Sequence, residues 1–150
     1  MQRFYRLSPA SPLVIYYGIP YLKYEDDFMV ALDKAVKTIE KSKENHPDAI
    51  TILLVHQNLP GAKEPDGFEV ESDLPKNLYK KFKKFTWVLS GHIHKPQQIF
   101  SNTYMLGATH QQDLGDMGCK MGYWYIYSNS APEFIPSKLP EFKYYKGVIS

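Results

Sequence analysis

The sequence predicts an α/β protein in which helices pack against a layered sheet. In the first half of the chain, apolar stretches typical of strands alternate with stretches of helical periodicity, in the order strand, helix, strand, helix, strand. In the second half, short β segments follow one another with turn residues between them, which indicates an antiparallel meander. Together these patterns predict an α/β layered sandwich.

The first strand is predicted at residues 13–17, where β-branched and aromatic side chains run together. Acidic residues at 25–27 then open a helix, where negative charge suits the N-terminal dipole. The helix stops before Pro47, and residues 1–12 are expected to be irregular. One apolar face is expected on this helix, at Phe28, Leu32, Ala35, Val36 and Ile39.

The next two strands are predicted at residues 49–55 and about 85–89. The first of these is apolar except for Thr51, which is typical of a strand buried on both faces. A long loop follows it, and a second helix begins at Leu74-Pro75. This helix carries Leu78, Phe82 and Phe85 on one face.

The later β segments are predicted at residues 98–101, 103–107 and 122–128. The tail from Ala131 carries prolines and aromatics, and we expect it to lie along the domain or to lead to a missing element.

Composition excludes several classes of protein. The chain has 150 residues, 43% of them hydrophobic, and a net charge of +2, so bulk charge does not indicate a nucleic-acid binder. No apolar run is long enough to span a membrane, and no signal peptide is evident, so no membrane association is expected. The single cysteine, Cys119, is expected to be a small buried residue and fits a reducing cytoplasm.

Histidines stand where two predicted strands end. His56 follows residues 49–55, and His92 and His94 follow Gly91 at the end of the third strand. In extended backbone His92 and His94 point to the same side. If the two strands are parallel neighbours, the three imidazoles converge at the carboxyl edge of the sheet. A surface turn or structural histidines are the alternative interpretation.

Imidazole clusters of this kind suit zinc, iron, nickel or manganese. A hydrolytic two-metal centre also needs carboxylates that bridge the ions and neutralise their charge. The sequence shows no aspartate near these histidines in the way that a bridging ligand requires.

Several segments resemble one known family. Leu54-Val55-His56, followed by Ser90-Gly91-His92-Ile93-His94, resembles the last two motifs of calcineurin-like metallophosphoesterases. Residues 106–116 (LGATHQQDLGD) look like the glycine-rich, glutamine-containing segment of the SbcD-type DNA repair nucleases, which ends in glycine and an acid. Gly18-Ile19-Pro20-Tyr21 resembles the segment after their central motif. The likeness spans most of the chain in the right order, and a phage version of the nuclease is compatible with it.

The resemblance implies a hydrolase, the exonuclease subunit of an SbcD-type enzyme. His56 and His92 would bind the second metal ion, and His94 the first. The family usually uses two divalent ions, commonly manganese, to place an activated water opposite the leaving oxygen of a phosphodiester. DNA is the implied substrate, and an ATPase of the structural-maintenance-of-chromosomes (SMC) type is the implied partner.

The family's earlier motifs are missing from this sequence. Residues 1–55 contain no Asp-x-His, Gly-Asp-x-x-Asp or Gly-Asn-His-Asp/Glu, which would supply the bridging aspartate and most ligands of the first metal. The chain therefore looks like the C-terminal part of a single metallophosphoesterase domain. It is expected to be a fragment, one half of a split enzyme whose partner polypeptide supplies the N-terminal half, or a degenerate domain kept for binding. An exposed sheet edge would favour the missing partner.

Other functions remain open at this point. A general phosphoesterase acting on small phosphoesters or phosphoproteins is one alternative, and a non-catalytic nucleic-acid-binding or assembly module is another. The lysine-rich helix at 76–84 offers contacts to DNA phosphates, although a solvated helix face is favoured. A turn is favoured over a substrate loop for residues 111–113, and sheet packing over base stacking for the aromatics at 123–127.

Overall fold

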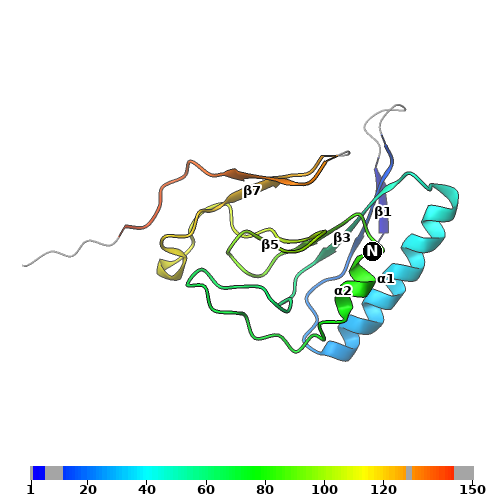
Figure 1. Ribbon diagram of the computed structural model, residues 1–150, viewed down its shortest axis with the longest axis horizontal. Helices are drawn as coiled ribbons and strands as arrows, with labels where there is room; N and C mark the ends of the chain where they lie inside the picture. The colour runs from blue at the N-terminus through cyan, green and yellow to red at the C-terminus, as the bar shows by residue number, and fades with distance from the viewer. Residues whose placement is uncertain (1, 6–11, 128–129, 144–150) are drawn as a thin grey trace, which may run out of the picture.

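The computed structural model describes residues 2–5, 12–127 and 130–143 and shows a mixed α/β protein (Figure 1). Its helices and strands follow in this order: β1 (Gln2–Tyr5), β2 (Val14–Gly18), α1 (Glu25–Asn45), β3 (Ile50–Val55), α2 (Leu78–Phe82), β4 (Trp87–Ser90), β5 (Gln97–Phe100), β6 (Thr103–Met105), the short 3-10 helix η1 (Leu114–Asp116), β7 (Gly122–Tyr125) and β8 (Glu133–Pro136).

The main sheet is mixed. In the described part of the chain it has six strands, in the order β1-β2-β3-β4-β6-β5. The inner strands β2, β3, β4 and β6 run parallel, and β1 and β5 pair antiparallel at the two edges. The three strands predicted in the first half of the chain are therefore confirmed as adjacent parallel strands.

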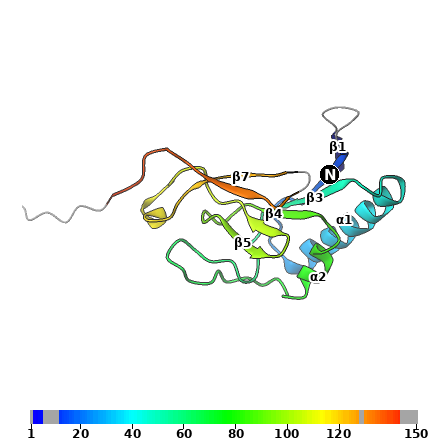
Figure 2. The same cartoon turned by 45° about the horizontal axis from the view of Figure 1, so that its top comes forward.

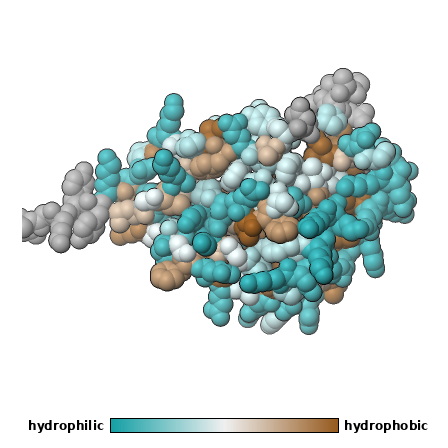
Figure 3. Space-filling view, in the orientation of Figure 1, coloured by the Kyte–Doolittle hydropathy of each residue, from teal (hydrophilic) through white to brown (hydrophobic). Residues whose placement is uncertain are grey.

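Helices α1 and α2 cover one face of this sheet, and the short β7–β8 hairpin lies over the other (Figure 2). On the helical face, Ile15, Leu53 and Val88 are fully buried against a core that includes Phe28 of α1 and Phe82 of α2. Each such side chain contributes about 1.5–3 kcal/mol of transfer free energy. Hydrophilic side chains dominate the outer surface in the region of α1 (Figure 3).

The amphipathic pattern of α1 is confirmed. Phe28, Leu32, Ala35 and Ile39 are all fully buried, and Val36 is half-buried beside them. The first turn carries the acidic residues at 25–27, and the helix ends at Asn45, shortly before the proline that cannot follow in helical geometry.

A pair of threonines fixes the register between β3 and β4. The Thr51 N–H donates to Thr86 Oγ1, and the Thr86 N–H donates to Thr51 Oγ1, both at 3.0 Å. This exchange satisfies the polar groups of Thr51, which is fully buried. The register that follows sets Val55 beside Ser90, so both strands end at the same level.

The second helix is shorter than the sequence predicts. It begins at Leu78 instead of 74–75 and ends at Phe82. Backbone bonds that span three residues, such as Leu78 N to Pro75 O and Phe85 N to Phe82 O, make turns at both ends. The predicted apolar residues Leu78, Phe82 and Phe85 are nevertheless all buried.

The N-terminal prediction is wrong in part. Residues 2–5 form β1, which pairs antiparallel with β2, whereas the sequence predicts an irregular segment over residues 1–12. Pairing with a neighbouring strand stabilises an edge strand that its own sequence does not specify. Residues 1 and 6–11 lie outside the described residues.

The predicted antiparallel meander in the second half is also wrong. Strand β5 pairs antiparallel with β6, but β6 joins the main sheet parallel to β4. Strand β7 ends at Tyr125 and pairs with β8 from the tail, and the rings of the opposed residues Trp124 and Phe134 pack together there. Ser128, the end of the predicted last segment, lies outside the described residues, as does the tail beyond residue 143.

In the described part of the chain, neither helix combines the length and the apolar character that a bilayer-spanning segment needs.

Candidate metal centre

The predicted histidines lie at the carboxyl edge of the sheet, where β3 and β4 end. Because these strands are parallel neighbours, the segments that leave them start side by side. The Gly91 N–H donates to Val55 O at 3.0 Å, which continues the pairing by one residue beyond β4. His56 and His92 come directly after this last contact, so the predicted convergence of these two histidines is confirmed.

The imidazoles of His56 and His92 pack edge to face. Their ring centroids are 5.1 Å apart and the ring planes differ by 82°. Tyr21, in the segment after β2, stacks on His92 with a centroid distance of 5.8 Å. Three consecutive strands of the parallel sheet thus contribute one ring each to this edge.

Gly91 is required by the closeness of this packing. A Cβ at position 91 would lie 2.8 Å from His56 Nδ1, which is too close for any side chain while the imidazole keeps this position. The sequence predicts a glycine that frees the backbone at a strand end. The structure shows that its role is to leave room for the neighbouring imidazole.

The expectation that His92 and His94 share an extended backbone is wrong. His92 has φ of 84°, the left-handed region, and residues 92–95 form a bend. His92 therefore turns toward His56 and Tyr21, whereas His94 contacts Asp116. Both histidines still line the same pocket.

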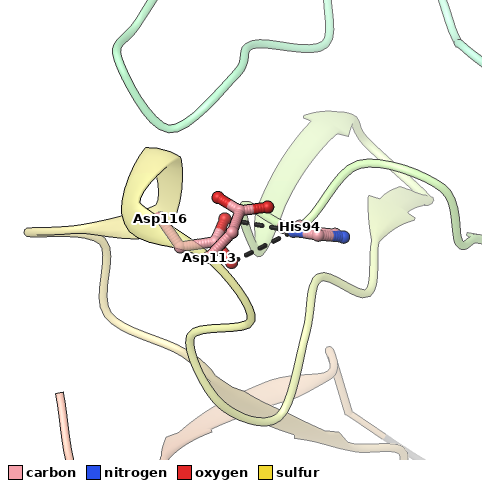
Figure 4. Close-up of side chains that lie close together, drawn as sticks. All are labelled: His94, Asp113 and Asp116. Atoms are coloured by element: carbon pink, nitrogen blue, oxygen red, sulfur yellow. Dashed lines mark hydrogen bonds and ion pairs between the residues drawn. The ribbon is translucent and has the colours of Figure 1, made fainter. Parts of the chain in front are cut away.

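His94 is bonded to a buried carboxylate. Its Nδ1 lies 3.1 Å from each carboxylate oxygen of Asp116, whose side chain is 2% exposed (Figure 4). The backbone N–H of Gln112 also donates to Asp116, at 2.8 Å. Asp113 lies beside them and caps η1 by accepting from the Gly115 N–H at 2.7 Å. Ligand atoms of His94, Asp113 and Asp116 all lie within 4.8 Å of one another.

A pocket of about 340 Å³ opens at this edge. Its polar lining includes His92, His94, Glu64, Asp66, Asp113 and Asp116. The prediction that no carboxylate lies near the histidines is therefore wrong for His94. The acids come from the loops after β3 and β6, which fold back onto the strand ends, and sequence spacing does not show this.

One sequence signal for the acidic loop was present. Gly107 has φ of 74°, and a Cβ there would lie 2.7 Å from His94 O. A glycine after an apolar strand segment can mark such a close backbone approach. In the sequence, Asp116 stands only in the family-like segment 106–116, and no pattern there indicates that it is a neighbour of His94.

The pKa of His92 is lowered from its ordinary value. Burial is the largest cause, and the nearby imidazoles of His56 and His94 lower it further, whereas Glu64 acts in the opposite direction. A lowered pKa favours the neutral imidazole, which is the form that binds metal ions.

These residues fit a divalent cation in part. Neutral imidazoles and carboxylates are suitable ligands for Mn2+ and its neighbours in the first transition row. Within the part of the chain that the structure describes, however, no carboxylate is hydrogen-bonded to His56 or His92. The assignment of His56, His92 and His94 as metal ligands stays a prediction.

The lysine-rich helix is largely engaged with its neighbours. Lys81 pairs with Asp33 of α1 at 2.5 Å, and Lys84 pairs with Glu40 at 3.0 Å. Lys83 lies over the ring of Phe100. These contacts favour the interpretation of this segment as a solvated helix face. They do not favour its interpretation as a contact surface for DNA phosphates.

Gln111 has a structural role. It is buried, donates to Cys119 O at 3.1 Å and accepts from the Phe142 N–H at 2.6 Å, so it ties the tail to the acidic loop. Cys119 itself is half-exposed, so its predicted burial is wrong. His110 is exposed and is not a lining residue of the pocket.

The aromatics at 123–127 divide between two faces. Trp124 packs against Tyr104 and Phe134, as predicted. Tyr123 and Tyr125 are 53% and 55% exposed, so the predicted packing role is wrong for them, because alternate residues of β7 face outward.

No protein-family model matches this chain, and no curated protein matches it.

Proposed function

We propose that this chain is the histidine-bearing part of a two-metal-dependent phosphodiesterase that hydrolyses DNA, an exonuclease subunit of the SbcD type with a metallophosphoesterase sandwich fold. The observation that carries the proposal is the pairing of His56 with His92 at the carboxyl ends of adjacent parallel strands, 5.1 Å between ring centroids. His94 lines the same pocket as His92, among carboxylates.

The chain's own residues would hold two divalent ions, with Mn2+ the proposed metal. His56 and His92 would bind one ion and His94 the other, and burial keeps His92 in the neutral form that ligation needs. When bound, such ions lower the pKa of a water and neutralise charge on a phosphodiester. Gly91 leaves room for the His56 imidazole, and Tyr21 stacks on the ring of His92.

A partner polypeptide would complete the centre. The His56–His92 pair needs carboxylate ligands for charge neutralisation, and the family's Asp-x-His and Gly-Asn-His-Asp/Glu motifs are not in the printed sequence. By the same resemblance, we propose that the enzyme works in the cytoplasm. It would act there together with an ATPase of the SMC type.

The sheet face opposite the helices supports this partner. Ile52 pairs with Tyr16 and Trp87 across the strands and shares their face, and it is half-buried. The neighbouring Leu54 is 37% exposed. The β7–β8 hairpin packs on Tyr104 at one side of this face, so the region over β2 and β3 offers apolar surface to a second layer.

The incomplete ligand set also favours a second candidate function. A non-catalytic module that binds DNA or assembles with other chains would keep the fold and need no metal. Binding of duplex DNA that persists in chelator would support this candidate.

The test is manganese-dependent hydrolysis of bis-p-nitrophenyl phosphate and of linear duplex DNA. The full chain is assayed alone and then mixed with a polypeptide that carries the missing motifs. We expect activity only in the mixture. Activity of the chain alone would contradict the need for a partner, and inactivity of both folded samples would contradict the proposed function.

A matched pair of variants makes the assay specific. His92→Gly removes a proposed ligand at a backbone position that glycine readily adopts. His110→Ala removes an exposed histidine that does not line the pocket. We expect the first variant to abolish activity in the mixture and the second to retain it. Turnover by the His92→Gly variant would contradict the ligand assignment.

A further inference from the structure

The contact between His94 and Asp116 fixes which ring nitrogen carries the hydrogen. A carboxylate accepts hydrogen bonds and does not donate them, so Nδ1–H donates to Asp116 across the 3.1 Å contacts. In a neutral imidazole this leaves Nε2 with a free lone pair. Figure 4 shows Nε2 on the side of the ring that points away from Asp113 and Asp116.

The surrounding loop holds Asp116 in place. Its carboxylate also accepts the Gln112 N–H at 2.8 Å, and its side chain is 2% exposed. Gln111 ties the same loop to Cys119 O. The carboxylate is therefore positioned by its own backbone and approaches His94 without needing a bound ion.

Two roles for Asp116 are compatible with its place in the cluster. It could bind an ion directly together with Asp113 and His94 Nδ1, or it could orient the His94 ring from behind. The hydrogen-bond lengths favour orientation, because Nδ1 and both oxygens of Asp116 already satisfy one another. Asp113 Oδ1, for its part, accepts from the Gly115 N–H.

We propose that Asp116 is a positioning residue that sets the ring orientation and tautomer of His94, so that Nε2 is presented to a divalent cation. Metal-ligating histidines commonly donate their other ring N–H to a carboxylate, which fixes the tautomer and raises the basicity of the ligand nitrogen. The inference rests on the proposed function, since it assigns the cation to the same centre.

The first measurement reads the ring itself. The full chain is labelled with 15N-histidine, and ring nitrogen shifts are recorded in chelator at about pH 8, above the ordinary histidine pKa of about 6.5. Loss of one signal set in His94→Gln assigns His94. We expect wild-type His94 to carry its hydrogen on Nδ1. A hydrogen on Nε2 would overturn the proposal.

The second measurement compares two isosteric variants. In Asp116→Asn the amide can donate to Nδ1, so we expect a substantial Nε2–H population and a fall in Mn2+ affinity of about 10- to 100-fold. Asp113→Asn removes a neighbouring charge but keeps the contact at Nδ1, so we expect the wild-type tautomer and a clearly smaller loss of affinity than in Asp116→Asn. Circular dichroism and a thermal melt confirm that both variants fold.

The outcomes separate the two roles and also separate this proposal from the proposed function. Equal losses of Mn2+ affinity in both variants would overturn orientation in favour of direct ligation. An unchanged tautomer and affinity in Asp116→Asn would overturn it as well. A wild-type chain that has the Nδ1–H ring but binds no Mn2+, alone or with the motif-bearing polypeptide, would support the ring assignment and contradict the proposed function.

Discussion

The imidazoles of His56 and His92 meet edge to face with their ring centroids 5.1 Å apart, although they follow different strands. Their contact depends on the parallel register of β3 and β4, which sets Val55 beside Ser90. The site is therefore created by strand pairing, and a change that leaves both histidines intact can still disturb it.

Gly91→Ala is such a change. The added Cβ would lie 2.8 Å from His56 Nδ1, so the imidazole must rotate away. His56 is exposed and can move, so we expect the free energy of unfolding to change by only about 1 kcal/mol, the usual cost of a displaced rotamer. We expect Mn2+ affinity, measured by calorimetric titration with the motif-bearing polypeptide present, to fall markedly.

Gly18→Ala is the matched control for that substitution. Position 18 ends β2, the neighbouring strand, and a Cβ there would meet nothing within 4 Å. We expect this variant to bind Mn2+ as the wild type does. Equal affinity in Gly91→Ala and the wild type would show that the position of His56 does not matter for the metal.

The backbone of His92 gives a second prediction. With φ of 84°, a residue other than glycine is strained at this position by roughly 1–2 kcal/mol. His92→Gly and His92→Ala lose the same ring contacts with His56 and Tyr21. We therefore expect His92→Gly to be more stable than His92→Ala by about 1 kcal/mol, measured by urea denaturation, with Mn2+ binding lost in both.

The reverse order of stability would contradict the left-handed conformation at His92. It would also mean that His92→Ala is the better variant for testing the proposed ligand, because the glycine variant would then carry a cost in backbone entropy.

The parallel core could be predicted from the sequence because its signals are local and consistent. Residues 50–55 are apolar except for Thr51, and α1 repeats buried side chains at helical spacing, so each element specifies itself. The expected burial of this strand on both faces is wrong, because Leu54 is 37% exposed on the face opposite the helices. Strands β1 and β8 could not be predicted in this way. Each is stabilised by a partner strand and carries little pattern of its own.

In the candidate site too, some contacts could be predicted from the sequence and others could not. His56 and His92 could be predicted to meet because both follow apolar strands. Asp116 could not be predicted as a partner of His94, because the contact depends on how residues 106–116 fold back over the strand end. The left-handed turn at His92 was also hidden, since histidine gives no signal for it.

The paired lysines of the second helical segment yield a third prediction. Lys81 and Lys84 are already neutralised by Asp33 and Glu40. We expect the double variant Lys81→Gln/Lys84→Gln to bind duplex DNA with unchanged affinity and unchanged salt dependence, measured by fluorescence anisotropy at several salt concentrations. Exposed ion pairs are worth about 0–1 kcal/mol each, so the free energy of unfolding should change little.

Lys80→Gln is the control for the loss of a single lysine charge, since Lys80 is exposed on the same helix. A salt slope reduced by about 1 for each lysine removed in the double variant would show that the helix contacts phosphates after all.

Tyr79 makes the stability of the fold depend on pH in the alkaline range. Its hydroxyl donates to Pro60 O at 2.5 Å, and its pKa is raised to about 12 by burial and then by the charge of Glu69. The folded chain thus favours the neutral phenol, so this contribution to stability is complete below the unfolded pKa of about 10 and is lost as pH rises toward 12.

At pH 8 we expect Tyr79→Phe to be less stable by about 1 kcal/mol, the usual net value of such a bond. The difference between wild type and variant, measured by urea denaturation, should shrink between pH 10 and 12. A difference that stays constant across that range would mean that Tyr79 ionises alike in the folded and unfolded chain.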